Sequence, residues 1–229
     1  MKSLKWMGWV GTFALVSLMW GCASTDQPLE VARYDHVIRV ACVGDSITFG
    51  DGIEERGTNS YPAQLGALLG DDFDVRNFGV SGATLLKKGD LPYWDVDAFR
   101  AVQAFEPDII IIKLGTNDTK PQNWEFADEF VNDYAALIDL FQSLPSSPRI
   151  WLCNPVPVYE ERWGIREEIL VQEVMPKIAE VAKAKGLPVI DMYTALSGMP
   201  DAFPDKIHPN ADGAGIMAKT VVQTLLPSR

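Results

Sequence analysis

Two features of this 229-residue sequence could carry out nucleophilic chemistry: a serine at the end of an apolar run, and an aspartate-histidine pair near the C-terminus. Ser46 lies in VACVGDSITFGDG, where the apolar run gives way to a glycine-rich turn. Asp205 precedes His208 by three residues, so within one turn its carboxylate can accept the imidazole Nδ1–H and leave Nε2 free to take a proton. The only other histidine, His36, precedes the apolar run. Ser46, Asp205 and His208 are therefore a candidate Ser-His-Asp triad.

A serine esterase also needs hydrogen-bond donors for the oxyanion that develops in its transition state. Gly79 offers a backbone N–H that no side chain shields, Asn117 offers an uncharged amide, and the backbone N–H of Ser46 would be the third donor. Taken singly, the glycine and the asparagine are ordinary turn residues, and a serine at such a corner is more often a helix cap than a nucleophile. The catalytic interpretation depends on these residues meeting in space.

The elements that must position these residues alternate along the chain. Short apolar runs, which we predict to be strands, lie at 37–43, 73–80, 108–114, 149–154 and 188–193. Helix-like segments lie at 61–70, 95–105, 124–143, 165–186 and 210–226. Strand and helix alternating five times predict an α/β fold, in which helices cover both faces of a five-stranded parallel sheet.

Polar clusters follow four of the five predicted strands. GDSITFG follows the first, NFGVSGAT the second, KLGTND the third and DKIHPN the fifth. In open parallel sheets, ligands bind beyond the carboxyl ends of the strands. We therefore expect the four clusters to converge at one edge of the sheet and to form a single site there.

Four stretches, taken together and in this order, resemble the four sequence blocks of the SGNH subgroup of GDSL hydrolases: GDSIT, NFGVSGA, GTND and DKIHPN. The resemblance implies Ser46 as nucleophile and first oxyanion donor, Gly79 and Asn117 as further donors, and Asp205 and His208 as the remaining triad members. It also implies a three-layer αβα sandwich around a flavodoxin-like sheet with strand order 2-1-3-4-5. The first block ends in isoleucine where the family name has leucine, which is an apolar exchange.

A finer resemblance concerns the substrate. GTNSYPAQL and KLGTNDTKPQNW are similar to secreted bacterial members of the family that act on acetylated carbohydrates, such as acetylxylan or sialate O-acetylesterases. This similarity implies hydrolysis of short acyl esters, O-acetyl groups on carbohydrates above all, through an acyl-enzyme intermediate. The expected partner is an acetylated carbohydrate or another small ester.

Four aromatic residues near the predicted strand ends are candidates for stacking on sugar rings: Tyr93, Trp94, Trp124 and Trp163. The alternative is that they pack helices onto the sheet. Two other functions stay open. One is a lysophospholipase-type or thioesterase-type lipid hydrolase, or an acyltransferase, with the same triad. The other is a non-catalytic carbohydrate-binding surface domain, although such a domain would not need an intact triad.

Ser81 is a rival nucleophile, because Gly79-Val80-Ser81-Gly82-Ala83 partly matches the nucleophile elbow of α/β-hydrolases. That elbow has a glycine two residues after the serine, where this chain has Ala83, so turn formation explains the stretch better. Only one histidine lies near the predicted site, and no carboxylate cluster has ligand spacing. We therefore expect neither a metal nor another cofactor.

The N-terminus predicts export. Lys2 and Lys5 precede an apolar stretch that is short for a membrane span, which is the layout of a signal peptide over residues 1–21. Gly21-Cys22 resembles a lipoprotein cleavage site, which implies that Cys22 is lipidated and anchors the protein to a bacterial envelope membrane. The alternative is cleavage near Ala23 and a periplasmic or secreted protein. Residues 22–36 would be a tether and residues 37–229 the hydrolase domain.

The charge excludes one class of partner. The formal net charge is −11, and removal of residues 1–21 takes away two lysines and no acid, which makes it −13. Such a surface repels the phosphates of nucleic acids, so we do not expect a nucleic-acid partner. Cys42 and Cys153 lie in apolar runs and are expected to be buried free thiols.

Overall fold

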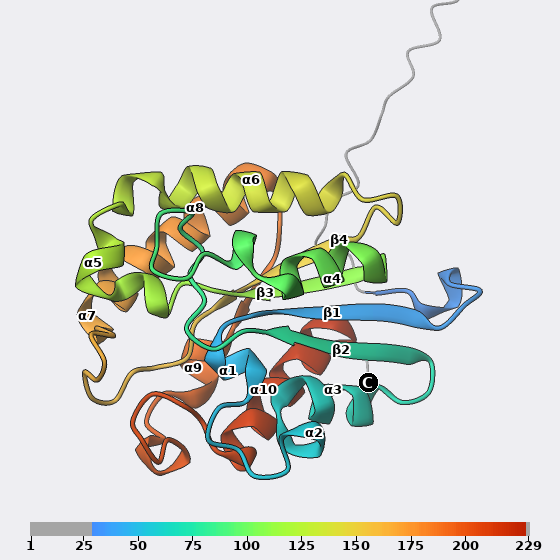
Figure 1. The fold of residues 1–229 in the computed structure, drawn as a ribbon. Coiled ribbons are helices and arrows are strands. Elements are labelled where there is room, and N and C mark those ends of the chain that lie inside the picture. The colour runs from blue at the N-terminus through green and yellow to red at the C-terminus, as the bar shows by residue number, and fades with distance from the viewer. Residues whose placement is uncertain (1–28, 228–229) are drawn as a thin grey trace, which may run out of the picture.

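The computed structural model describes residues 29–227 and has a five-stranded parallel sheet at its centre (Figure 1). The strands lie in the order β2-β1-β3-β4-β5. Their bounds are β1 Ile38–Gly44, β2 Phe73–Gly79, β3 Ile109–Lys113, β4 Arg149–Asn154 and β5 Val189–Asp191. Both the predicted fold class and the implied strand order are confirmed.

Helices cover both faces of the sheet (Figure 1). On one face lie α4 Asp97–Phe105, α6 Phe130–Gln142 and α8 Met175–Lys185; on the other lie α3 Tyr61–Leu69, α9 Met192–Leu196 and α10 Ala211–Leu225. The sequence of the central strand β3 does not alternate between apolar and polar residues, because both faces of this strand are buried. Ile110 and Ile112 pack into one core and Ile109 and Ile111 into the other, so neither face of β3 contacts water.

Two predicted helices are interrupted. The segment predicted at 124–143 divides into a short helix α5, Pro121–Trp124, and the longer α6. The segment predicted at 165–186 runs from α7, Glu167–Ile169, through a π-helical turn into α8. It ends at Gly186, whose φ of 64° lies in the left-handed region that glycine adopts without a steric penalty.

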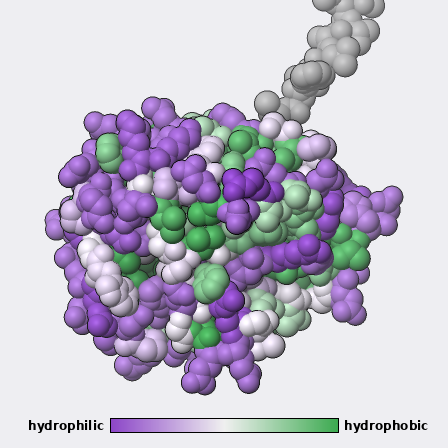
Figure 2. Space-filling model, viewed as in Figure 1, coloured by the Kyte–Doolittle hydropathy of each residue, from purple (hydrophilic) through white to green (hydrophobic). Residues whose placement is uncertain are grey.

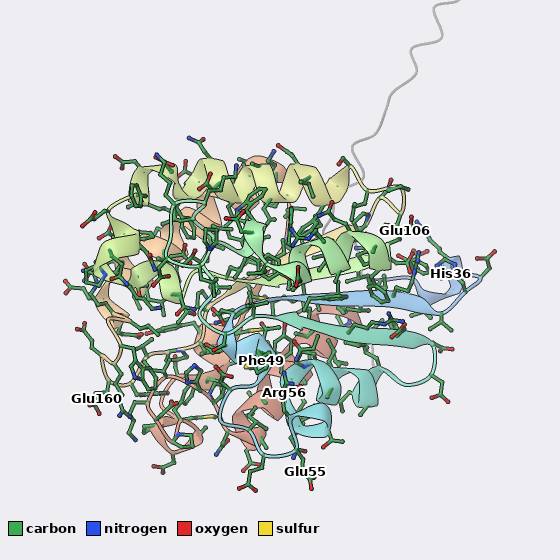
Figure 3. The ribbon with its side chains drawn as sticks, in the orientation of Figure 1. His36, Phe49, Glu55, Arg56, Glu106 and Glu160 are labelled. Atoms are coloured by element: carbon green, nitrogen blue, oxygen red, sulfur yellow. The ribbon has the colours of Figure 1, made fainter. Side chains whose placement is uncertain are left out.

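The carboxyl ends of the strands lie at the left of Figure 1. Two further short helices, α1 Ser46–Phe49 and α2 Arg56–Asn59, follow β1 in the chain. The amino ends lie at the right, with His36 (Figure 3). There His36 Nε2 lies 3.2 Å from Asp108 Oδ1. His36 is therefore at the edge of the sheet opposite to Ser46.

The N-terminal part of the described chain packs on the domain. The backbone N–H of Leu29 donates to the Leu225 carbonyl at 3.0 Å, and the Leu29 side chain is buried. Residues 29–36 of the predicted tether thus contact the hydrolase domain. The predicted signal peptide and Cys22 lie outside the described residues. Within residues 29–227, no helix has the length and apolar character needed to cross a bilayer.

The character of the surface and the burial of the two cysteines agree with what the sequence predicts. Most of the face seen in Figure 2 is hydrophilic, with hydrophobic residues in small patches. Cys42 and Cys153 are both free and buried, as predicted. Burial raises the pKa of the Cys42 thiol to about 12, so this thiol stays protonated at neutral pH.

Candidate active site

Ser46 is the first residue of α1, directly after the sharp corner at the end of β1. Asp45 caps this helix, because its Oδ1 accepts the Ile47 N–H at 3.0 Å. The Ser46 N–H belongs to the first helical turn and so has no partner within the helix. A Cβ at Gly44 would lie 2.6 Å from the Lys113 carbonyl oxygen, so glycine is required where β1 passes β3. The corner presents a buried Ser46 at the carboxyl edge of the sheet.

A buried ion pair holds the corner in place. Lys113 Nζ lies 3.0 Å and 2.9 Å from the two carboxylate oxygens of Asp45, and it also contacts Thr116 Oγ1 at 2.8 Å. Both charged side chains are fully buried. Burial lowers the pKa of Lys113, and the attraction of Asp45 opposes that shift. Asp45 therefore has a structural task, since it ties the end of β1 to the end of β3.

The structure brings the three candidate triad residues together. His208 Nε2 lies 2.8 Å from Ser46 Oγ, and His208 Nδ1 lies 2.7 Å from Asp205 Oδ2. The other carboxylate oxygen of Asp205 accepts the backbone N–H groups of His208 and Ile207. Partial burial acts to raise the pKa of Asp205, but the hydrogen bonds from His208 and Ile207 hold it below its usual range. An ionised Asp205 only accepts, so Nδ1 carries the imidazole proton and Nε2 faces the serine as an acceptor.

Of the two predicted oxyanion donors other than Ser46, Asn117 borders the pocket and Gly79 does not. The Asn117 side chain is buried in the turn after β3, borders the pocket that contains Ser46 and His208, and donates one amide hydrogen to the Ala83 carbonyl at 3.1 Å. The Gly79 N–H instead donates to Asn77 Oδ1 at 2.9 Å. The prediction of Gly79 as a donor is therefore wrong. This glycine is required because a Cβ there would lie 2.2 Å from the backbone nitrogen of Phe49.

Gly79 borders a separate cavity, beside Phe49 and Arg56. These two side chains lie next to each other in Figure 3, and the Arg56 guanidinium carbon lies 3.6 Å from the centre of the Phe49 ring. Neither Ser46 nor His208 borders that cavity. The edge strand β2 therefore ends beside the catalytic corner without contributing its last residue to the pocket.

Gly82 is the glycine of NFGVSGA that lies at the pocket. It borders the pocket together with Ser46 and Asn117, and its φ of +82° lies in the left-handed region. Among residues 29–227, no hydrogen bond to the Gly82 N–H is found. The signal for this residue was present, because NFGVSGA contains two glycines. Only the structure shows that the N–H of the first of these glycines, Gly79, already donates a hydrogen bond to Asn77.

The pocket has a volume of about 370 Å³, and most of the residues that line it have polar side chains. Its lining comprises Ser46, Asp51, Gly52, Ser81, Gly82, Asn117, Lys120, Trp163, Ile165, Asp205 and His208. The rival nucleophile Ser81 also lies here, but its hydroxyl donates to the Asp51 carboxylate, which leaves it without a histidine partner. Within the described chain, no group of three histidine, cysteine or acidic side chains is arranged to hold a metal ion.

Of the four aromatic candidates, only Trp163 is at the pocket. Its side chain is 59 % exposed, and its ring centre lies 5.7 Å from that of His208. Trp163 and Gly164 both have positive φ, and the Ile165 N–H closes the turn on the Arg162 carbonyl at 2.9 Å. A bulky residue in this conformation is strained, which is a feature of functional positions. Arg162 anchors the turn, because it donates to the Asp205 carbonyl at 3.1 Å.

The other three aromatic residues pack the fold, so the prediction that they bind sugar is wrong. Tyr93 is fully buried, and its hydroxyl donates to the Phe78 carbonyl at 2.7 Å. Trp94 Nε1 donates to the Leu85 carbonyl at 3.0 Å. Trp124 is buried, and its Nε1 donates to Glu173 at 2.8 Å. None of the three borders the pocket.

The parallel sheet, with a serine and a histidine meeting at its carboxyl edge, is the arrangement of an SGNH-type hydrolase. The chain belongs to the GDSL-like lipase/acylhydrolase family, whose sequence model matches residues 42–216. It is similar to an acetylxylan esterase of Xylanibacter ruminicola, with 41 % identity over 212 residues. It is also similar to a multidomain esterase of Ruminococcus flavefaciens, with 25 % identity over 122 residues.

The coverage of these relatives is unequal. The first alignment includes 85 % of this chain and 44 % of the acetylxylan esterase, and the second includes 52 % of this chain and 15 % of the multidomain esterase. The chain thus spans less than half the length of either curated relative.

Solved structures share the fold at low sequence identity. A carbohydrate acetylesterase from Sinorhizobium meliloti has a TM-score of 0.68 and 18 % identity, with 83 % of this chain and 99 % of that chain covered. An inhibitor-bound aryl esterase of M. smegmatis also has a TM-score of 0.68, with 20 % identity and 82 % and 100 % coverage. The similarity extends over almost the whole of those chains.

Proposed function

We propose that this protein is a serine esterase that removes O-acetyl groups from carbohydrates. The observation that carries the proposal is the position of His208, whose ring nitrogens lie 2.8 Å from Ser46 Oγ and 2.7 Å from Asp205 Oδ2. Membership of the GDSL-like lipase/acylhydrolase family and the 41 % identity to an acetylxylan esterase support an acetyl ester as substrate.

In this mechanism, His208 Nε2 accepts the proton of Ser46 while Oγ attacks the ester carbonyl. The ionised Asp205 stabilises the imidazolium that forms. The Ser46 N–H, the Gly82 N–H and the Asn117 side-chain amide donate to the oxyanion. His208 then protonates the leaving sugar hydroxyl, which leaves an acetyl group on Ser46. In the second half-reaction, His208 deprotonates a water molecule that attacks this acyl-enzyme, and acetate and free Ser46 are the products.

The pocket supports a short acyl group over a fatty chain. Most of its lining residues have polar side chains, and among the described residues only Trp163 and Ile165 line it with large apolar side chains. A lipid hydrolase would gain about 0.8 kcal/mol for each methylene group buried in a matching tunnel. Without apolar walls beyond these two residues, added carbons would stay in water. The exposed ring of Trp163 has the size and the position to stack on the sugar that carries the acetyl group.

The experiment compares wild type, Ser46→Ala and Ser81→Ala on nitrophenyl acetate, nitrophenyl octanoate and acetylated xylan. Ser81→Ala is a matched control, because both serines border the same pocket. We expect acetate release by wild type and Ser81→Ala, none by Ser46→Ala, and a higher kcat/KM for acetate than for octanoate. Full activity of Ser46→Ala would refute the nucleophile. A strong octanoate preference without acetate release from any acetylated polysaccharide would refute the carbohydrate substrate.

We also propose that the chain is exported and anchored through Cys22, on the basis of the charged and apolar residues at 2–20 and of Gly21-Cys22. Expression of the full chain in bacteria with a labelled fatty acid tests this. Label should enter wild type and be absent from Cys22→Ser. An unlabelled protein that is recovered from the periplasm or medium would favour the cleaved, secreted form.

A further inference from the structure

Asp118 is a buried carboxylate to which the catalytic mechanism gives no task. It lies directly after Asn117 in the turn that follows β3, and its side chain is fully buried. Its two oxygens accept two successive backbone N–H groups, those of Leu85 at 3.0 Å and Leu86 at 2.8 Å. Lys113, the lysine at the end of the same strand, pairs with Asp45 instead. Burial of a carboxylate is unfavourable, so its presence requires a physical reason.

The segment that Asp118 holds is the one that borders the pocket. Gly82 lies at the start of this segment, and Leu85 and Leu86 lie at its end. Between them, the Ala83 carbonyl accepts the Asn117 side-chain amide at 3.1 Å. The neighbours Asn117 and Asp118 therefore hold the same five residues at two points. This arrangement connects the position of the Gly82 N–H to the position of the Asn117 amide.

We propose that Asp118 is a positioning residue that sets the distance between the two oxyanion donors, the Asn117 amide and the Gly82 N–H. The inference rests on the proposed esterase function and adds a residue to its machinery. A carboxylate suits the task because both of its oxygens accept, whereas an amide has one acceptor and one donor group. An asparagine at this position would turn its NH₂ group toward one of the two backbone N–H groups.

Other hydrogen bonds also hold the segment 82–86. Loss of the Asp118 carboxylate should therefore displace this segment without unfolding it. The Thr84 N–H donates to the Leu91 carbonyl, and the Tyr93 N–H donates to the Thr84 carbonyl, each at 2.9 Å. The Leu85 carbonyl accepts Trp94 Nε1 at 3.0 Å. These bonds hold the middle of the segment against residues 91–94. The two bonds to Asp118 are what holds its end against the turn that carries Asn117.

The charge state of Asp118 follows from its surroundings. Burial raises its pKa to about 7, although the Leu86 and Leu85 N–H groups lower it, and the negative charge of Asp45 raises it further. Lys113, which is paired with Asp45, and the Tyr134 phenol are the other titratable groups that Asp118 influences. A protonated Asp118 would lose an acceptor for one N–H. The clamp is therefore complete only when this carboxyl group is ionised.

The test measures kcat and KM of Asp118→Asn with nitrophenyl acetate. We expect kcat to fall about 10- to 100-fold with KM changed less than about twofold, because the oxyanion donors act mainly in the transition state. Asp133→Asn is the matched control. Asp133 is also buried and accepts the next backbone N–H of the same stretch, that of Lys87, at 2.9 Å. Its variant should keep kcat near that of wild type.

A double-mutant cycle with Asn117→Ala separates positioning from a general structural effect. If Asp118 acts through Asn117, adding Asp118→Asn to Asn117→Ala should lower kcat by much less than it does in wild type. Equal losses in both backgrounds, or equal losses in Asp118→Asn and Asp133→Asn, would overturn the inference. Wild-type kcat in Asp118→Asn would also overturn it and leave the esterase function intact. A wild type that is inactive on every ester would refute the function itself.

If Asp118→Asn does not fold, wild type provides the readout. The clamp requires an ionised Asp118 in addition to a general base that can accept a proton, so log kcat should rise with pH on its acidic limb with a slope above one. A slope of one would show a single ionisation and would contradict a clamp that opens when Asp118 is protonated in this pH range.

Discussion

Ser46 Oγ lies 2.8 Å from His208 Nε2, although 162 positions separate the two residues in the chain. The contact does not come from neighbouring strands, because β5, which precedes His208, is at the far edge of the sheet from β1. It comes from α10, which packs beside α3 on the face that carries Val40 and Cys42. Gln64 Nε2 fastens the start of α10 by donating to the Ala211 carbonyl at 2.8 Å. The helix therefore delivers His208, three residues before its first turn, to the corner after β1.

Asn117→Ala tests the donor that comes from a side chain. The variant should lower kcat on nitrophenyl acetate by about 10²–10³ with little change in KM, because the amide bonds the oxyanion and makes a weaker contact with the ground-state carbonyl. Steady-state kinetics at saturating substrate, with a thermal melt of each protein, gives the comparison. An unchanged kcat would reduce Asn117 to a turn residue that orders Ala83.

Trp163→Ala tests the exposed ring beside His208. If the ring stacks on sugar, KM for acetylated xylan should rise about three- to tenfold, which corresponds to the energy of one aromatic stacking contact. The kcat/KM for nitrophenyl acetate should change less than about threefold, because a small ester need not reach the rim. Trp163→Phe should retain part of the affinity for xylan. Equal losses on both substrates would instead assign Trp163 to the support of His208.

Lys113→Met tests the ion pair under the nucleophile. Removing one partner of a buried pair leaves an uncompensated charge, so the free energy of unfolding should fall by about 3–5 kcal/mol. Asp45→Asn in the same chain removes that charge and keeps an oxygen for the Ile47 N–H, so it should recover much of the loss. Urea denaturation of the single and double variants measures both values. A single variant as stable as wild type would contradict the role of Lys113.

Some site residues could be predicted from the sequence, namely those whose role depends on their position in the topology of the fold. Ser46, Asn117 and His208 each follow an element whose position the alternation of strands and helices predicts, so their convergence could be expected. The choice between Gly79 and Gly82 depends on which N–H group is already bonded, and Asn77 decides that by a side-chain contact. No pattern in the chain reports such a contact.

The aromatic residues show the same limit. Tyr93 and Trp94 do lie near strand ends, but their polar atoms bond the Phe78 and Leu85 carbonyls, which turns the rings inward. Trp163 stays outside because a turn with two left-handed residues holds it there. The sequence around these three aromatic residues does not distinguish the buried ones from the exposed one. Their burial depends on the tertiary structure.

The pH dependence of stability gives a test of the buried carboxyl group without any substrate. Burial raises the pKa of Asp118 to about 7 in the native protein, whereas an unfolded aspartate titrates near 3.8. Between these values the native state binds more protons than the unfolded state, so stability falls as pH rises from about 4 to 7. Asp205 has a lowered pKa, and its contribution is lost only as pH falls below the usual aspartate range. The two groups therefore act in different pH windows.

Asp118→Asn removes the charge that opposes folding at high pH. The free energy of unfolding of wild type should fall between pH 5 and pH 8 by more than that of the variant, with a difference of about 2–3 kcal/mol, because about two pH units of the titration of Asp118 lie in this window. His36, whose pKa is raised by its bonds to Asp35 and Asp108, titrates in both proteins, so the comparison cancels its effect. Urea denaturation at the two pH values, with Asp133→Asn as a control, provides the measurement. Parallel losses of stability in wild type and Asp118→Asn would mean that Asp118 is ionised at both pH values, and the clamp on the oxyanion donors would then be independent of pH across this range.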